Sequence, residues 1–125
     1  SAASDVYKRQ IEGQGSLFHP SFAGVSLGLL HGSQPDKFIV CHEPTRSNMR
    51  GVKNKLPSIS EVISKTIELG KLTNPDIKCA GIALNTSNML NKSEDMKKMI
   101  SDKHSIPCLD PLKDDLSDFI NMINK

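Results

Sequence analysis

Apolar residues along the chain gather in blocks, and the period inside the blocks alternates between that of a strand and that of a helix. The runs at 38–41, 79–84 and 106–109 have strand length, and the middle one is apolar on both faces, as in an interior parallel strand. We expect a further strand that ends at Ile11, where a sharp glycine turn follows. The sequence therefore predicts four strands.

In the other blocks the apolar residues recur every three or four positions, which is the spacing of one helix face. The segments with this spacing are 22–32, 58–72, 94–103 and 116–123. Ser58 and Glu61 fit a capping box at the start of the second segment. In the first segment Gly24, Gly28 and Gly32 fall four residues apart, which predicts a helix face pressed closely against a sheet.

The alternation of strand and helix predicts the fold class. It is typical of an α/β fold with three layers, in which helices cover both faces of a mainly parallel sheet. Ligands bind such sheets at the carboxyl ends of the strands. Polar groups follow each predicted strand, at 12–16, 42–46, 85–87 and Asp110. We expect these groups to share one cleft.

Length, charge and cysteine content limit the classes of partner and the cell compartment that we expect for this protein. The 125 residues predict one domain, and their net charge of +2 is too near neutral for a nucleic-acid or membrane partner. Neither an apolar run of membrane-spanning length nor a signal peptide is visible, so we expect a cytoplasmic protein. Cys41, Cys79 and Cys108 lie in apolar segments, where free thiols behave as small hydrophobes.

The first ten residues differ from the rest of the chain. Residues 1–10 have neither strand alternation nor a helical stripe, and 5–10 resemble the translated end of a transposase-based sequencing adaptor. We therefore expect a non-native tail at 1–10 and a partial domain at 11–125, with natural sequence lost upstream. A frayed native terminus is the alternative.

The residues after the first predicted strand are candidates for chemistry. Glu12 can hold Mg²⁺ through a water or act as a general base on an amine, or its carboxylate can cap the following helix. Gly13 and Gly15 allow a ligand to approach the backbone closely, although a tight turn needs the same residues. Gln14 and Ser16 are candidate donors to a substrate carboxylate, and Ser16 is an equally good N-cap.

Histidines near the predicted strand ends are candidates for proton transfer. His42 follows a strand and His19 follows the glycine turn, so both are candidate catalytic bases. We expect His31 to pack or to cap its own helix. Glu43 can bind substrate or orient a histidine, with a salt bridge to Arg46 as the alternative.

A basic segment, residues 45–57, follows the second predicted strand and carries four cations and no acid. Arg46 and Arg50 are the best candidates to bind an anion, because a guanidinium donates two parallel hydrogen bonds to a carboxylate or phosphate. A solvated basic loop is the alternative. No zinc site is expected at Cys41 and His42, since neighbours on a strand point to opposite faces.

Several long motifs resemble one family. The motifs are 11–25, 27–36, 41–44 with Arg46, Arg50 and Gly51, and 81–87. They are similar to the C-terminal domain of the D-glutamate N-acetyltransferase-like family, and the similarity runs from Ile11 to the end of the chain. The resemblance implies a P-loop-nucleoside-triphosphatase-like domain that follows an N-terminal Rossmann-like domain. It also implies acetyl transfer from acetyl-CoA to the amino group of D-glutamate.

The same domain resembles dethiobiotin synthetase, in which a Glu-Gly-x-Gly turn lies beside Mg²⁺, phosphates and substrate, and a strand-end Asn faces the nucleotide base. This resemblance implies binding roles for Glu12, Gly13 and Gly15, and for Asn85. The chain has no Gly-x-x-x-x-Gly-Lys-[Ser/Thr] motif, so we expect the P-loop strand to be missing and the fragment to be inactive alone.

The function implied by the resemblance is that of a fragment of an amino-acid N-acyltransferase. Acetyl-CoA would be the acyl donor, a small anionic amino acid the substrate, and the missing Rossmann-like domain the partner. A Mg²⁺- and ATP-dependent enzyme of the dethiobiotin-synthetase type is the first alternative. A non-catalytic degenerate P-loop domain, which supports its neighbour or a homo-oligomer, is the second.

Overall fold

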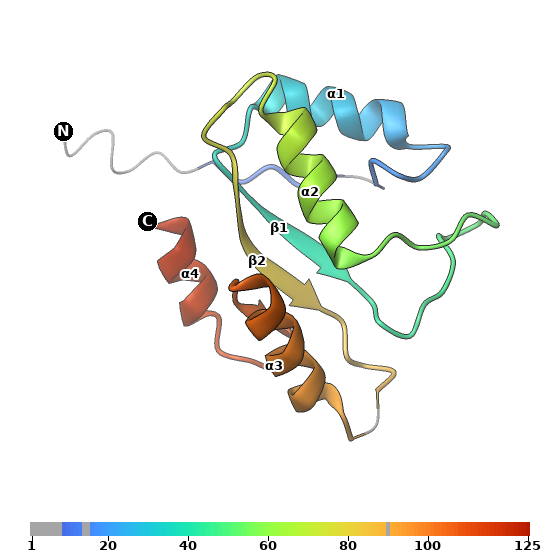
Figure 1. The fold of residues 1–125 in the computed structure, drawn as a ribbon, viewed down its shortest axis with the longest axis vertical. Coiled ribbons are helices and arrows are strands. Elements are labelled where there is room, and N and C mark those ends of the chain that lie inside the picture. Colours follow the sequence, from blue (N-terminus) through green and yellow to red (C-terminus); the bar gives the residue numbers. More distant parts are fainter. Residues whose placement is uncertain (1–8, 14–15, 90) are drawn as a thin grey trace.

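The computed structural model describes residues 9–13, 16–89 and 91–125. In these residues helices and strands alternate along the chain (Figure 1). The elements are α1 (Ala23–Ser33), β1 (Lys37–His42), α2 (Ile59–Gly70), β2 (Lys78–Leu84), α3 (Ser93–His104), β3 (Cys108–Leu109) and α4 (Ser117–Ile123). All of them were predicted, with bounds that differ by at most two residues.

The three strands form one parallel sheet in the order β1-β2-β3. Val40 pairs with Ile82, and Ile82 pairs with Cys108. Consecutive parallel strands need a crossover, which α2 supplies between β1 and β2 and α3 supplies between β2 and β3. The predicted α/β class with a parallel sheet is therefore confirmed, and β2 is the interior strand that its apolar pattern indicated.

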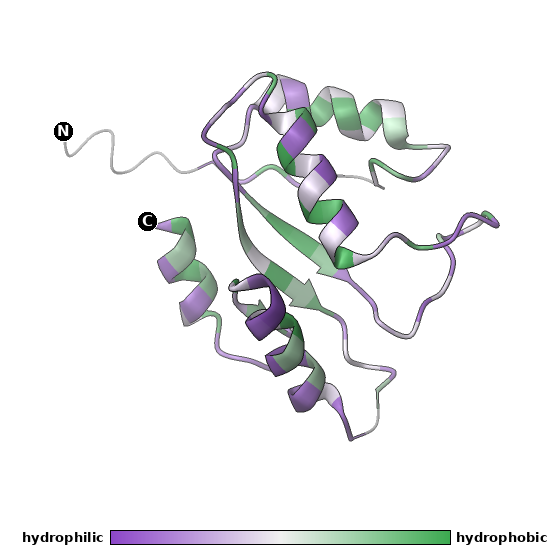
Figure 2. Cartoon of the chain, in the orientation of Figure 1, coloured by the Kyte–Doolittle hydropathy of each residue, from purple (hydrophilic) through white to green (hydrophobic). Residues whose placement is uncertain are grey.

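α2 and α3 cover one face of the sheet, where the core lies. The core consists of Ile82, Leu84, Ile100 and Cys108, with Ile59, Ile63, Met96 and Ile106 packed against it. In Figure 2 the strands are mainly apolar, whereas the helices carry both apolar and polar residues. The predicted capping box of α2 is confirmed, because Glu61 N donates to Ser58 Oγ (3.1 Å) and Ser58 N donates to Glu61 Oε1 (3.3 Å). None of the described helices is both long and apolar enough to cross a membrane.

α4 covers the opposite face of β2. Gly81 alternates with the core residues of this strand, so it faces the other side of the sheet. Phe119 of α4 packs there and is 5% exposed. Lys37 Nζ donates to Met122 O (2.6 Å) and Ile123 O (3.1 Å), which ties the end of α4 to the start of β1. Helices therefore lie on both faces of the sheet, as predicted.

Replacing Gly81 by alanine is expected to destabilise the chain. A Cβ at this position would lie 2.6 Å from Cε1 and 2.7 Å from Cδ1 of Phe119, so the ring and α4 must move. Overpacking of this kind lowers the free energy of unfolding by about 1–3 kcal/mol. Urea denaturation followed by circular dichroism measures the change.

Gly28→Ala is the matched control for this substitution. Nothing lies within 4 Å of a Cβ at Gly28, which is inside α1. Alanine there should raise the free energy of unfolding by about 0.5–1 kcal/mol, because glycine is the poorer helix former. Changes of the same sign and size at the two positions would contradict the close contact with Phe119.

Two predictions for the amino-terminal part are wrong. Residues 9–13 form no strand, and Ile11 is 53% exposed. One apolar residue beside a glycine turn gives no alternating pattern to bury, and a strand needs a neighbour with which to pair. The glycines of α1 do not press against the sheet, because nothing lies within 4 Å of a Cβ at Gly24, Gly28 or Gly32. α1 packs on α2 instead.

The cysteines are only partly as predicted. Cys79 and Cys108 are buried, whereas Cys41 is exposed. Cys41 pairs with Ala83 and lies on the α4 side of the sheet, where α4 contacts mainly β2. The side chains of β1 on that face are therefore less covered than those of β2.

Candidate functional site

Loops that follow neighbouring strands meet at the carboxyl edge of the sheet. We refer to them as the strand-end loops, which are residues 42–46, 85–89 and 110–114. Asn85 N donates to His42 O (2.8 Å), and Asn88 Nδ2 donates to Glu43 Oε1 (2.9 Å). The first two loops are therefore in direct contact, and the polar groups after β1 and β2 converge as the topology predicted.

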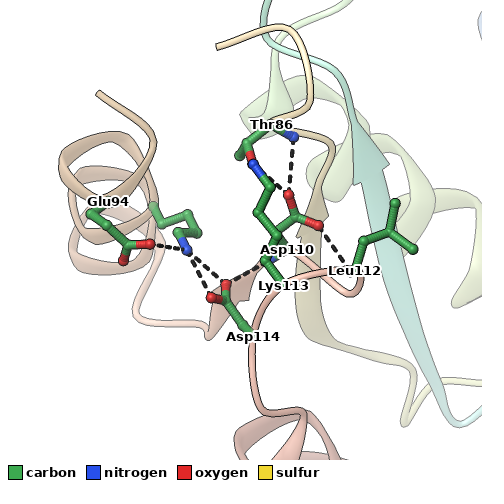
Figure 3. Close-up of polar contacts among 7 residues, drawn as sticks. Thr86, Glu94, Asp110, Leu112, Lys113 and Asp114 are labelled. Atoms are coloured by element: carbon green, nitrogen blue, oxygen red, sulfur yellow. Dashed lines mark hydrogen bonds and ion pairs between the residues drawn. The ribbon is translucent and has the colours of Figure 1, made fainter. Parts of the chain in front are cut away.

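Asp110 is the buried centre of the contact between the second and third strand-end loops (Figure 3). It is 2% exposed, and Thr86 beside it is fully buried. Thr86 donates both its backbone N–H (3.2 Å) and its hydroxyl to Asp110 Oδ2, while Leu112 N donates to Oδ1 (2.9 Å). The hydrogen bond from the Thr86 side chain is the largest cause of the lowered pKa of Asp110, and it acts against burial, which raises that pKa. The carboxylate is therefore charged and fixes the peptide after β2.

A buried ion pair continues this cluster. Lys97 of α3 is 5% exposed, and its Nζ donates to Glu94 Oε1 (2.6 Å) and Asp114 Oδ2 (2.7 Å). Asp114 Oδ2 also accepts from Asp110 N (2.7 Å), as Figure 3 shows. Burial lowers the pKa of Lys97, but the hydrogen bonds and charges of Asp114 and Glu94 outweigh burial and raise it. Lys97 is therefore charged, and it joins α3 to the third strand-end loop.

Acid should destabilise the chain through Asp110 and Asp114. The pKa values of both carboxyl groups lie below their ordinary value of 3.8 in the folded chain. Below 3.8 the unfolded chain therefore binds more protons, so the free energy of unfolding falls as the pH falls from 3.8 toward the folded pKa values. Urea denaturation between about pH 5 and pH 2 measures this loss. In Asp110→Asn the free energy of unfolding should fall less over this pH range. A fall equal to that of wild type would contradict the contribution of the charged Asp110 to stability.

His42 ends β1 and lies half-buried at the carboxyl edge. Burial lowers the pKa of its imidazole from the ordinary value of 6.5, against the opposing effect of the Glu43 charge. The imidazole is therefore mainly neutral at neutral pH. No described residue makes a hydrogen bond with either ring nitrogen. A neutral ring with an available nitrogen is what a general base requires.

The other two predicted histidines hold loops and helices together. His19 is 8% exposed, and Ser21 N donates to its Nδ1 (3.1 Å). The ring hydrogen is therefore on Nε2, which donates to Arg50 O (2.8 Å). These bonds occupy both nitrogens of His19 and favour a structural role over the catalytic one. His31 is half-buried, and its Nε2 lies 2.8 Å from Leu69 O, which joins α1 to α2, so of the two expectations for His31 packing is confirmed and capping of its own helix is not.

The basic segment turns back on itself through an antiparallel bridge. Gly51 at its turn has a φ of 75°, which is the left-handed region that favours glycine. Arg50 is exposed, and no described residue accepts a hydrogen bond from its guanidinium. Arg46 forms an ion pair of 3.1 Å with Glu43, which was the alternative expectation. Arg50 can therefore bind an anion directly, whereas Arg46 must share or exchange its partner.

Asn85 offers hydrogen-bond donors at the same edge. Its Oδ1 accepts from Ser87 N (3.1 Å) and Ser87 Oγ (2.7 Å), which identifies the other side-chain atom as the amide nitrogen. Asn85 is exposed, and no described residue accepts from Nδ2. Both hydrogens of Nδ2 are therefore available to a ligand.

The glycine turn is only partly described. Glu12 is exposed and has no polar contact with another described residue. A Cβ at Gly13 would lie 3.7 Å from Leu29 of α1, while Gln14 and Gly15 lie outside the described residues. No three His, Cys, Asp or Glu side chains in the described part of the chain are grouped as metal ligands. The roles expected of Glu12, as base or as Mg²⁺ ligand, stay predictions.

Ser16 belongs to a turn and not to the start of α1. Its Oγ accepts from Phe18 N (3.1 Å), and its carbonyl accepts from His19 N (3.2 Å). α1 begins at Ala23 without a side-chain cap. The expectation that Ser16 is the N-cap is therefore wrong, because residues 17–22 separate Ser16 from the start of α1. Its role as a donor to substrate stays a prediction.

Roles for Thr86, Lys97 and Lys113 were not predicted from the sequence. The position of Thr86, just after a buried strand, could have indicated its role, because a side chain there can form a hydrogen bond with the residue that follows the neighbouring strand. Lys97 stands three residues after Glu94 and three before the core residue Ile100, which places a cation on the inner face of α3. Such a lysine needs a partner, and no local pattern pointed to Asp114.

Comparison with known proteins gives consistent matches. A family model described as "Domain of unknown function (DUF1611_C) P-loop domain" matches residues 2–120. A D-glutamate N-acetyltransferase of Pseudoalteromonas sp is 47% identical over 120 residues, which are 94% of this chain and 36% of the relative. One of Tritonibacter scottomollicae is 42% identical over 106 residues, which are 82% of this chain and 32% of the relative. The crystal structure of a DUF1611 family protein from Anabaena variabilis superposes with a TM-score of 0.79 at 25% identity, over 91% of this chain and 34% of that chain. The chain thus spans about a third of the length of these relatives.

Proposed function

The chain belongs to the DUF1611_C P-loop domain family, and from this premise we propose that it is part of an enzyme that transfers the acetyl group of acetyl-CoA to the amino group of D-glutamate. Two relatives that carry this activity in their names support the proposal. The chain resembles about a third of each, so the rest of the enzyme would lie outside these 125 residues.

The observation that carries the proposal is that His42 and Asn85 lie together at the strand-end loops. His42 is a neutral imidazole without a hydrogen-bond partner among the described residues. Asn85, whose backbone N–H donates to His42 O at 2.8 Å, has a side-chain amide nitrogen from which no described residue accepts. Arg50 lies outside these loops, in the basic segment, where His19 Nε2 donates to its carbonyl oxygen (2.8 Å) and no described residue accepts a hydrogen bond from its guanidinium. A base, neutral donors and a cation suit an anionic amine substrate.

These groups suggest how the reaction would run. The ammonium of D-glutamate loses a proton to His42, and the free amine attacks the acetyl carbonyl carbon of acetyl-CoA. A carbon–nitrogen bond forms and the carbon–sulfur bond breaks. Of the two protons that the ammonium loses in total, one passes to the coenzyme A thiolate and the other to solvent. Asn85 Nδ2 would donate to the oxygen that becomes negative during the attack.

The test is product formation by the intact enzyme. Incubation with acetyl-CoA and D-glutamate should give N-acetyl-D-glutamate by mass spectrometry, together with one equivalent of free coenzyme A. L-Glutamate is the control for chirality. Failure to form N-acetyl-D-glutamate, with the enzyme folded, would reject the proposal.

A second candidate follows from the family description, which is that of a P-loop domain. Such a domain favours nucleotide binding, and with it a Mg²⁺- and ATP-dependent reaction of the dethiobiotin-synthetase type. Release of ADP that depends on an added substrate would support this candidate. Acetyl transfer at full rate without ATP and Mg²⁺ would reject it.

A further inference from the structure

Lys113 belongs to the third strand-end loop, between β3 and α4, and its side chain reaches the second loop. Its Nζ donates to Thr86 Oγ1 (3.0 Å), while Lys113 itself is exposed. Thr86 is fully buried, and its hydroxyl donates its one hydrogen to Asp110. The hydroxyl must therefore accept from Lys113, so the direction of both bonds is fixed. A buried carboxylate thus orients a buried hydroxyl, and this hydroxyl holds an exposed ammonium (Figure 3).

The ammonium of Lys113 has donors to spare. It carries three N–H groups, and the bond to Thr86 uses one of them. No other described residue accepts a hydrogen bond from it. Lys113 and Asp110 attract each other, since, besides the hydrogen bond from Thr86, the Lys113 charge contributes to the lowered pKa of Asp110, but Lys113 Nζ hydrogen-bonds Thr86 Oγ1 and not the carboxylate. The remaining N–H groups are available to an anion.

Polar side chains of the other two strand-end loops lie at the same edge of the sheet as Lys113. Thr86 directly follows Asn85, whose Nδ2 has no acceptor among the described residues. The same loop contacts Glu43 through Asn88. Glu43 in turn holds Arg46 at 3.1 Å. The loops that carry Arg46, Asn85 and Lys113 are therefore neighbours at one edge of the sheet.

We propose that Lys113 is an anion-binding residue of the strand-end site and that Asp110 is a positioning residue, which sets Lys113 through Thr86. The inference takes its substrate class from the proposed function. The anion is a carboxylate of the acidic amino acid or a phosphate of coenzyme A, which share negatively charged oxygens as acceptors. If Lys113 served only to tie two loops together, its loss would change stability and leave ligand affinity unchanged.

Calorimetry on the intact enzyme tests the binding role. D-Glutamate and coenzyme A are titrated separately, which distinguishes the two sources of the anion. Lys113→Met should raise the Kd of one of them about tenfold, the effect of losing one charge-assisted hydrogen bond. Lys113→Arg should retain most of the affinity. Lys98→Met on α3 is the control, because Lys98 is exposed and makes no hydrogen bond or ion pair with a described residue of the strand-end loops. A Kd for both ligands that changes no more in Lys113→Met than in Lys98→Met would overturn the inference.

Thr86→Val tests the positioning role. Valine keeps the volume of threonine but removes the hydroxyl that accepts from Lys113. The Kd of the ligand that depends on Lys113 should rise about threefold, and Thr86→Ser should restore it because the hydroxyl returns. A lower thermal midpoint with an unchanged Kd in Thr86→Val would overturn the positioning role. The proposed function is tested separately, by formation of N-acetyl-D-glutamate by the wild-type enzyme. Absence of this product would reject the proposed function and would leave the result on anion binding by Lys113 unaffected.

Discussion

Replacing Asp114 by alanine is expected to lower the free energy of unfolding by about 3 kcal/mol, because it leaves a buried ammonium without its best partner. The side chain of Lys97 is 6% exposed, whereas its other partner, Glu94, is 82% exposed and is screened by water. Asp110 N would lose its acceptor in the same substitution. Urea denaturation followed by circular dichroism measures the change, since the chain has no tryptophan.

Two further variants distinguish the effect of the unpaired Lys97 charge from the effect of losing the hydrogen bond between Asp110 N and Asp114. Lys97→Met removes the ammonium and leaves Asp114, whose side chain is 22% exposed and still accepts from Asp110 N, so the loss should be smaller. Lys97→Met combined with Asp114→Asn leaves no unpaired charge and keeps an acceptor, so it should be more stable than Asp114→Ala. A loss in Asp114→Ala below about 1 kcal/mol, the size of a surface ion pair, would contradict the burial of this pair.

The sheet and its helices could be predicted because the pattern of apolar and polar residues within each segment indicates which side chains are buried. β2 is apolar on both faces, as an interior strand must be, and Ser58 and Glu61 mark where α2 begins. The strand expected at Ile11 could not be judged in this way, since strand formation depends on a neighbour that no local pattern identifies. The contact of Gly81 with Phe119 is of the same kind, because the two residues come from different elements.

The candidate site could be predicted where it depends on topology alone. Parallel strands end at one edge, so His42 and Asn85 were expected together, and a hydrogen bond of 2.8 Å joins their loops. The hydrogen-bond partners of individual side chains could not be predicted, because many of these partners lie far away in the sequence. His19 has the position of a catalytic residue in the sequence, yet Arg50, 31 residues away, occupies one of its nitrogens. Asp110 stood at a predicted strand end, but its bond to Thr86 required the fold.

Replacing His42 by glutamine in the intact enzyme is expected to lower kcat by about 10²–10⁴-fold, the range that general acid–base catalysis contributes. Glutamine has a similar size and can form hydrogen bonds, but it does not take up a proton. In wild type, kcat/KM should fall as the pH falls through the lowered pKa of His42, because the protonated ring accepts no proton from the amine. This acid limb should be absent in His42→Gln. Initial rates of coenzyme A release across the pH range check both expectations.

Two more variants decide whether the base is His42 or Glu12. His104→Gln is the control, because His104 lies in the last turn of α3 and should leave kcat and the acid limb as in wild type. Glu12→Gln tests the carboxylate that is the first candidate base along the sequence. An acid limb that is lost in Glu12→Gln and kept in His42→Gln would assign proton transfer to Glu12. Full activity in both variants would place the chemistry in another part of the enzyme, because no other described group at the strand-end loops is a neutral base with a free acceptor.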